Sequence, residues 1–122
     1  MPHISPWPYP GARWWRMDFH AHTPASLDTR AWQRAIGTND AVTPERWLLW
    51  FMQRGIDCVA ITDHNTGEWI DPLKEAYERL KAQRPETFRE LHLFPGVEIS
   101  VNGGFHLLAI FDKDATTADI HR

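Results

Sequence analysis

The chain has 122 residues, with 13 Lys+Arg against 16 Asp+Glu for a formal charge of −3. This length holds one domain at most, and so mild a charge gives no argument for binding nucleic acid or a membrane surface. No apolar run approaches the roughly 20 residues of a membrane-spanning helix, and the first residues lack the basic start and apolar core of a signal peptide. With one cysteine, Cys58, no intrachain disulfide can form, and we expect a cytoplasmic protein that does not bind a membrane.

Residues 1–13 contain four prolines and a glycine, so we expect an extended, aromatic-rich arm there and a folded domain over 14–122. The apolar run at 14–19 predicts the first strand. A turn-rich loop follows it, and then a short helix is expected at 29–36.

The next helix has clear start and stop signals. Thr43 is a favourable N-cap, Pro44 suits the first helical position, and Glu45 lies in the first turn. Gly55 is expected just beyond the end of this helix. The apolar face is formed by Trp47, Leu48, Phe51 and Met52.

Another helix is predicted to begin at Asp71 and Pro72, an N-cap and first-position pair, and to end at Pro85. We expect an ion pair one turn apart between Glu75 and Arg79. The apolar stripe of this helix is formed by Leu73, Ala76, Tyr77 and Leu80.

Three further segments have the pattern of strands. Residues 56–62 are a short apolar run that predicts a buried parallel strand, 91–94 predict a third strand leading into 95–100, and 105–111 a fourth. Residues 116–122 resemble the start of another helix. This order predicts an α/β fold with a largely parallel sheet, or part of a barrel.

Polar side chains gather where the predicted strands end. His20 and His22 are two residues apart, so in an extended strand both imidazoles point to one side. His64 follows the second strand, Glu98 follows the third, and His106 lies near the start of the fourth. Functional groups of α/β folds collect at the carboxyl ends of the strands, so we expect these residues to meet.

Their chemistry suits metal ions. Four imidazoles and one or two carboxylates, Glu98 with Asp28 or Asp63, form a nitrogen and oxygen donor set that fits Zn²⁺, Mn²⁺ or Fe²⁺ better than Ca²⁺. The set exceeds the need of one tetrahedral ion, and a bridging carboxylate would hold two ions about 3.5–4 Å apart, as in phosphatases and nucleases. Phosphoester hydrolysis is the natural reaction for such a site, carried by His20, His22, His64 and Glu98.

Each residue also has a purely structural interpretation. His64 could cap the following turn, Glu98 could pair with an arginine or cap a backbone group, and His106 could be a buried core histidine. Asp63 is expected to orient a ligand imidazole. His92 alternates with two leucines and is expected to face solvent, away from the site.

Four segments, taken in order, closely resemble the first motifs of the PHP (polymerase and histidinol phosphatase) domain: Asp18-Phe19-His20-Ala21-His22-Thr23, Ile61-Thr62-Asp63-His64-Asn65, Pro95-Gly96-Val97-Glu98-Ile99-Ser100 and Phe105-His106-Leu107-Leu108. The resemblance covers about residues 15–112. It implies a distorted (β/α)7 barrel with a two- or three-metal centre that hydrolyses phosphoesters.

By motif position, the resemblance implies that His20 and His22 bind one metal, that Glu98 bridges, and that His64 and His106 serve the other ions. The arm and the tryptophan-rich opening are similar to PHP modules that precede an AAA- or SMC-like ATPase. This similarity implies an ATPase domain or protein as a partner.

The chain departs from the family in two places. The acid or histidine usual five residues after the second histidine is replaced by Leu27, and Asp28, one residue later, is the expected ligand. The late motifs are missing, and Asp119-Ile120-His121 comes too early to be the final D-x-H, so we expect His121 in an exposed tail. The sequence thus corresponds to the first half of the barrel, and the sheet edge left uncovered predicts a dimer or higher oligomer.

Two functions remain open. The first is a metal-dependent phosphoesterase that uses two or more divalent ions on phosphate mono- or diesters, such as nucleotides, sugar phosphates or nucleic-acid ends. The second is a catalytically silent metal-binding or regulatory module that acts with an ATPase partner. A nuclease would need a basic groove, of which Arg13, Arg16, Arg30 and Arg34 give a weak hint.

Overall fold

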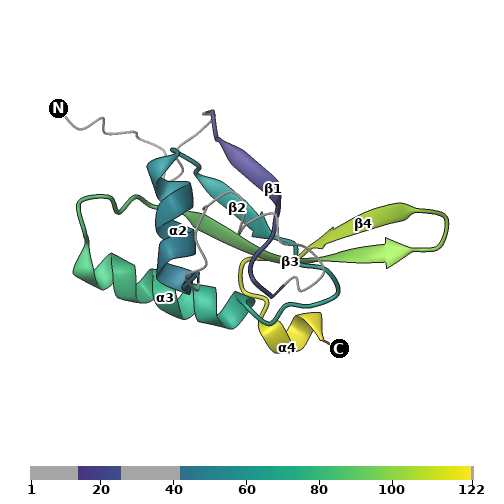
Figure 1. The fold of residues 1–122 in the computed structure, drawn as a ribbon. Helices are drawn as coiled ribbons and strands as arrows, with labels where there is room; N and C mark the ends of the chain where they lie inside the picture. The colour runs from purple at the N-terminus through teal and green to yellow at the C-terminus, as the bar shows by residue number, and fades with distance from the viewer. Residues whose placement is uncertain (1–13, 26–41, 122) are drawn as a thin grey trace, which may run out of the picture.

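The computed structural model describes residues 14–25 and 42–121. These residues form a mixed α/β fold in which a curled, four-stranded mixed sheet, half a barrel in shape, carries three helices (Figure 1). The predicted arm at 1–13 and the predicted helix at 29–36 lie outside the described residues. The expected α/β class is therefore confirmed for the part of the chain that the structure covers.

The strands are β1 (Met17–Ala21), β2 (Cys58–Ile61), β3 (His92–Val101) and β4 (Phe105–Ile110), and they lie in this order across the sheet. β1, β2 and β3 run parallel, and β4 returns antiparallel to β3. The helices are α2 (Pro44–Gln53), α3 (Ile70–Gln83) and the short α4 (Thr117–Ile120). None of these helices has the length and apolar character needed to cross a bilayer.

Helix α2 forms as its sequence predicts. The side chain of Thr43 accepts a hydrogen bond of 3.2 Å from the backbone nitrogen of Arg46, which caps the first turn. Gly55 follows the helix end with φ of +72°, a conformation that favours glycine. All four residues of the predicted apolar face are buried.

Helix α3 differs from its prediction at two points. It begins at Ile70 with Trp69 at the N-cap, so Asp71 is not the cap but lies in the first turn. The Asp71 carboxylate instead accepts a 3.1 Å hydrogen bond from the backbone of Thr117, at the start of α4. Arg79 pairs with Glu45 of α2 and not with Glu75, because packing of the two helices brings Glu45 to the guanidinium.

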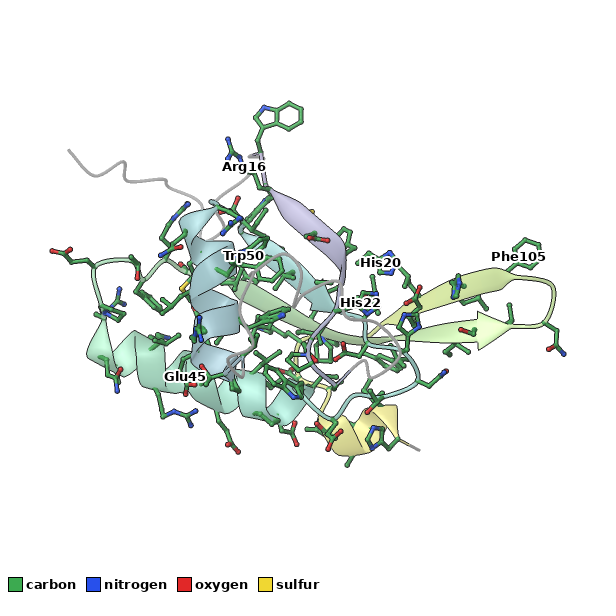
Figure 2. All side chains as sticks on the ribbon, in the orientation of Figure 1. Arg16, His20, His22, Glu45, Trp50 and Phe105 are labelled. Carbon is green, nitrogen blue, oxygen red and sulfur yellow. The ribbon has the colours of Figure 1, made fainter. Side chains whose placement is uncertain are left out.

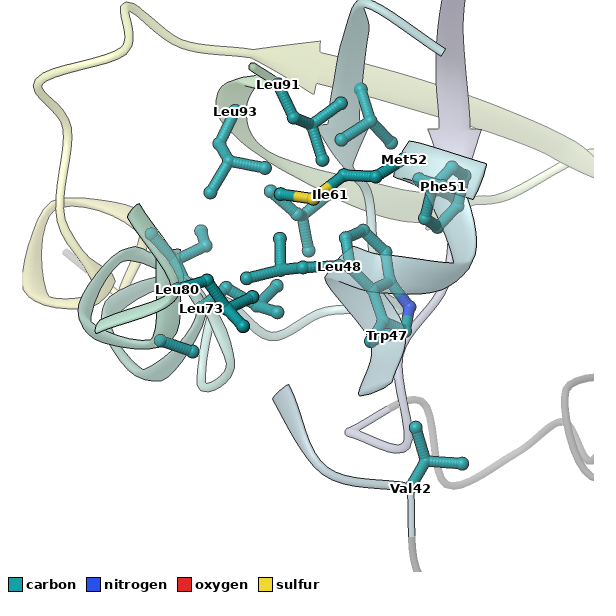
Figure 3. Close-up of a cluster of buried hydrophobic side chains, with 14 residues drawn as sticks. Val42, Trp47, Leu48, Phe51, Met52, Ile61, Leu73, Leu80, Leu91 and Leu93 are labelled. Carbon is teal, nitrogen blue, oxygen red and sulfur yellow. The ribbon is translucent and has the colours of Figure 1, made fainter. Parts of the chain in front are cut away.

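The core lies between the helices and one face of the sheet. β2 is the most buried strand: Val59 and Ala60 are fully inaccessible, as expected of a central parallel strand. Helices α2 and α3 pack against this face, and Figure 3 shows their side chains interleaved with those of the strands. The labelled core residues are Val42, Trp47, Leu48, Phe51, Met52, Ile61, Leu73, Leu80, Leu91 and Leu93.

Strand β1 begins later than predicted, at Met17. Trp14 precedes it and is 99% exposed, so the apolar run at 14–19 is only partly a strand. The register against β2 is Asp18 to Val59 and then Ala21 to Ile61, so β1 holds one extra residue in this interval. Such a bulge twists a strand and re-aims its side chains, and here it immediately precedes His22.

Strand β4 lies at the sheet edge among the described residues and is apolar on both faces. Phe105 is 68% exposed and Leu107 58%, and Leu108 and Ile110 are also exposed. The strand contains no lysine, arginine, carboxylate, proline or bulge, which are the usual protections of an edge. This edge is the feature expected of an incomplete barrel, and self-association through it stays a prediction.

Candidate metal centre

The sheet topology brings the predicted site residues to one edge. The carboxyl ends of the parallel strands β1 and β2 meet there, and β3 and the antiparallel β4 continue past this edge as a hairpin. His20 lies in β1 and His22 directly after it, His64 follows β2, and His106 is the second residue of β4. Figure 2 shows His20 and His22 next to the base of the hairpin formed by β3 and β4.

Glu98 reaches this edge from the middle of a long strand. β3 pairs with β2 only as far as Pro95 and then extends beyond the end of β2. Glu98 donates its backbone N–H to the carbonyl of Asp63 at 2.8 Å, and its own carbonyl accepts from Asn65 at 2.9 Å. These bonds align the loop that carries His64 with the carboxyl-terminal half of β3.

Four imidazoles surround the Glu98 carboxylate. Oε1 lies 3.2 Å from Nε2 of His20 and 3.7 Å from Nδ1 of His106. Oε2 lies 3.1 Å from Nε2 of His64 and 3.4 Å from Nε2 of His22. The rings of His22 and His64 are stacked, with centroids 4.7 Å apart.

These spacings fit ligands around shared ions. With Zn–N and Zn–O bonds of about 2.0–2.1 Å, two ligands of one tetrahedral ion lie about 3.3 Å apart. Two groups of three ligand atoms lie within 4.8 Å of one another: His20, His22 and Glu98, and His64, Glu98 and His106. Because Glu98 belongs to both groups, the described residues could hold two metal ions with this carboxylate between them.

Burial and charge distinguish this cluster from an ordinary ion pair. Glu98 is only 3% exposed, yet its Oε2 accepts no hydrogen bond from the described residues. A buried carboxylate oxygen that accepts no hydrogen bond needs a compensating partner, and a cation held by the surrounding imidazoles would supply one. Burial, and then the charge of His64, lower the pKa of His22 below its ordinary value of 6.5. His22 is therefore neutral at pH 7, the form that binds metals.

A second layer of hydrogen bonds fixes the backbone of the site. The carboxylate of Asp63, which is fully buried, accepts bonds from the backbone nitrogen of Thr23 at 2.6 Å and from its hydroxyl at 2.5 Å. The His22 carbonyl accepts a 2.9 Å bond from the indole of Trp47 on α2. Asp63 Oδ1 lies 3.9 Å from His22 Nδ1, longer than a hydrogen bond, whereas the short hydrogen bonds of this carboxylate hold Thr23, the residue after His22.

Helix α4 fixes the loop that follows His64. The backbone nitrogen of Gly67 donates to Nε2 of His121 at 2.9 Å, and the Gly67 carbonyl accepts from the hydroxyl of Thr117 at 2.7 Å. A Cβ on Gly67 would lie 2.7 Å from the side chain of Ile120, so only glycine permits this close approach. His121 is exposed, as predicted, but it is not an idle tail residue.

The structure thus brings together five of the six predicted metal ligands. The sixth, Asp28, lies outside the described residues. His106 is exposed, so its interpretation as a buried core histidine is wrong. His92 lies away from the cluster, with its ring against Trp15 and its Nε2 3.6 Å from Glu90.

Sequence reasoning missed two contributions, those of Thr23 and of α4. Thr23 directly follows the second histidine, and that adjacency was the available signal. No local pattern pairs α4 with the loop at Gly67, since these segments are about 50 residues apart.

Comparison with known proteins adds little. No protein-family model matches the chain. An uncharacterized protein of Streptococcus pneumoniae serotype 4 is 33% identical over 63 residues, which are 52% of this chain and 24% of that protein. The match therefore spans about a quarter of the length of that relative, whose name states no function.

Proposed function

We propose that this chain is the N-terminal part of a PHP domain and acts as a metal-dependent phosphoesterase. The observation that carries the proposal is the buried Glu98 carboxylate with four imidazole nitrogens 3.1–3.7 Å from its oxygens. The order of the motifs along the chain and the half-barrel sheet are in keeping with it.

The donor set fits the ions proposed. Imidazoles and carboxylates are ligands that Zn²⁺, Mn²⁺ and Fe²⁺ take, and Glu98 Oε2, buried and without a hydrogen bond from the described part of the chain, is left for a cation. His20 and His22 would hold one ion, His64 and His106 another, and Glu98 both. When bound, such ions supply Lewis acidity that lowers the pKa of water and neutralises charge developing on a phosphoryl group.

Other residues hold the metal-binding histidines in position. Asp63, through Thr23, holds the backbone beside His22. Helix α4, through His121, holds the loop after His64. His20 and His106 are both about half exposed, so the cluster opens to solvent and a phosphate ester can approach without a change of fold.

The test combines metal content with turnover. Purified protein is loaded with Mn²⁺, Zn²⁺ or Fe²⁺, its metal is measured by elemental analysis, and release of p-nitrophenol is followed from a phosphate monoester and from a diester. We expect at least one ion per chain and metal-dependent turnover, both lost in a His20→Ala, His22→Ala double variant. His92→Ala, a histidine remote from the cluster, should keep both.

Two results would contradict the proposal in different ways. Equal metal content in the double variant and in the unchanged protein would refute the ligand assignment. Full metal loading without turnover of either substrate would refute the catalytic assignment and favour the silent module that acts with an ATPase partner.

A further inference from the structure

A cluster of basic and aromatic side chains lies at the opposite edge of the sheet from the histidines. Arg16 directly precedes β1, and the loop after α3 leads into the start of β3. Figure 2 shows Arg16 at the far end of β1 from His20 and His22. We call this surface the basic edge; it consists of Arg16, Tyr77, Lys81, Arg84, Phe88 and Arg89.

Part of the basic edge is a groove. A groove of about 220 Å³ is lined by three cationic side chains, two aromatic ones and Glu90. The rings of Tyr77 and Phe88 are 5.8 Å apart, and the guanidinium of Arg84 lies 5.2 Å from the centre of the Phe88 ring. Its lining has three cationic side chains against one carboxylate, Glu90, so the groove has an excess of positive charge.

Two arginines converge beside this groove. A Cβ on Gly55 would lie 3.0 Å from Nη1 of Arg89 and 3.3 Å from Nη1 of Arg16, so both guanidinium groups approach the same point. Among the residues that the structure describes, neither guanidinium has a carboxylate within salt-bridge distance. Two guanidinium groups this close repel each other. An anion bound between them would be attracted to both and would offset that repulsion.

We propose that the basic edge binds single-stranded nucleic acid, with one phosphate held between Arg16 and Arg89 and a base against Phe88. Planar guanidinium groups match the geometry of phosphate oxygens, and aromatic rings beside a cationic track are the features of single-strand binding sites. Trp14, 99% exposed and two residues before Arg16, offers a second ring for stacking.

Other anionic partners fit this surface less well. An acidic peptide would satisfy the arginines but has no base to stack on the rings. In duplex DNA the bases are already stacked on each other, so their faces are not open to Phe88 or Trp14. The proposal does not depend on the metal centre, because no residue of the basic edge belongs to the histidine cluster.

The test measures binding of a fluorescein-labelled oligothymidylate by anisotropy, in EDTA so that metal ions do not contribute. Removing the shared phosphate contact with Arg16→Gln, Arg89→Gln should weaken binding roughly tenfold at low salt and reduce the slope of log K against log salt by about 0.7. Trp14→Ala should weaken it by roughly fivefold or more through loss of stacking. The matched control is Arg46→Gln, an exposed arginine at the start of α2, which should bind as the unchanged protein does.

Three outcomes would overturn the proposal: unchanged binding in the double variant, an equal loss in Arg46→Gln, or equally effective competition by an acidic peptide or a duplex. The variants leave the histidine cluster intact, so metal content and p-nitrophenol release should be unaffected. A failure here is thereby distinguishable from a failure of the phosphoesterase proposal.

Discussion

Replacing Glu98 by glutamine should change stability in opposite directions with and without metal. Without ions, Glu98 is a buried carboxylate, 3% exposed, whose Oε2 accepts no hydrogen bond from the described residues. A buried polar group that lacks its partner costs about 1–3 kcal/mol, and more when charged. Glutamine has nearly the same shape and no charge, and its amide can donate to a neutral imidazole.

We therefore expect Glu98→Gln to be more stable than the unchanged protein by about 1–3 kcal/mol in EDTA at pH 8. For a domain of this size that is a rise in Tm of about 4 °C per kcal/mol. With metal at a hundredfold excess over Kd, the unchanged protein gains about 2.7 kcal/mol per site, and the variant loses most of this gain. The order of the two stabilities should then reverse.

The assay is urea unfolding of both proteins, in EDTA and in excess Mn²⁺. Glu90→Gln serves as the control, because Glu90 is an exposed acid remote from the cluster and should show no metal-dependent difference. The reasoning is refuted if Glu98→Gln is destabilised equally in both conditions. That result would mean that Glu98 is a structural acceptor whose charge the folded protein needs without any ion.

Three further predictions concern the supports of the fold and the site. The hydrogen bond from Arg79 lowers the pKa of Glu45 below its ordinary 4.5, so this pair stabilises the fold above that pH and the contribution is lost as pH falls through the lowered value. Arg79→Gln should accordingly cost less than about 1 kcal/mol at pH 7, since the pair is exposed, and nothing in acid, as measured by urea unfolding at both pH values. Gly67→Ala should cost about 1–3 kcal/mol in the same assay, because the added Cβ meets Ile120; a neutral effect would show that α4 does not hold this loop. Asp63→Asn should weaken metal affinity by about 10–100-fold in a titration, and unchanged affinity would show that the contact with Thr23 does not position the ligands.

Local sequence signals determined the elements wherever a local cause exists. The cap at Thr43 and the apolar face of α2 required no tertiary information, because capping bonds and helical periodicity involve residues only a few positions apart. The predicted start of α3 was wrong because aspartate is a common N-cap residue, yet in the folded chain the Asp71 carboxylate accepts a hydrogen bond from the backbone of Thr117. The Glu75–Arg79 pair failed for a similar reason: Glu45 of another helix lies closer to the guanidinium.

The sequence by itself determined the α/β class and the residue types able to bind metal, because apolar strands followed by polar residues are patterns within a few neighbouring positions. Only the tertiary structure decided that four imidazoles meet at one buried carboxylate. This arrangement requires β1, β2 and β3 to be parallel and in register. It also requires β3 to extend beyond the end of β2 and β4 to pair antiparallel with β3, which places His106 near Glu98. The bulge in β1, the bond from Asp63 to Thr23 and the support of the Gly67 loop by α4 likewise depend on contacts between segments distant in sequence, which no local pattern encodes.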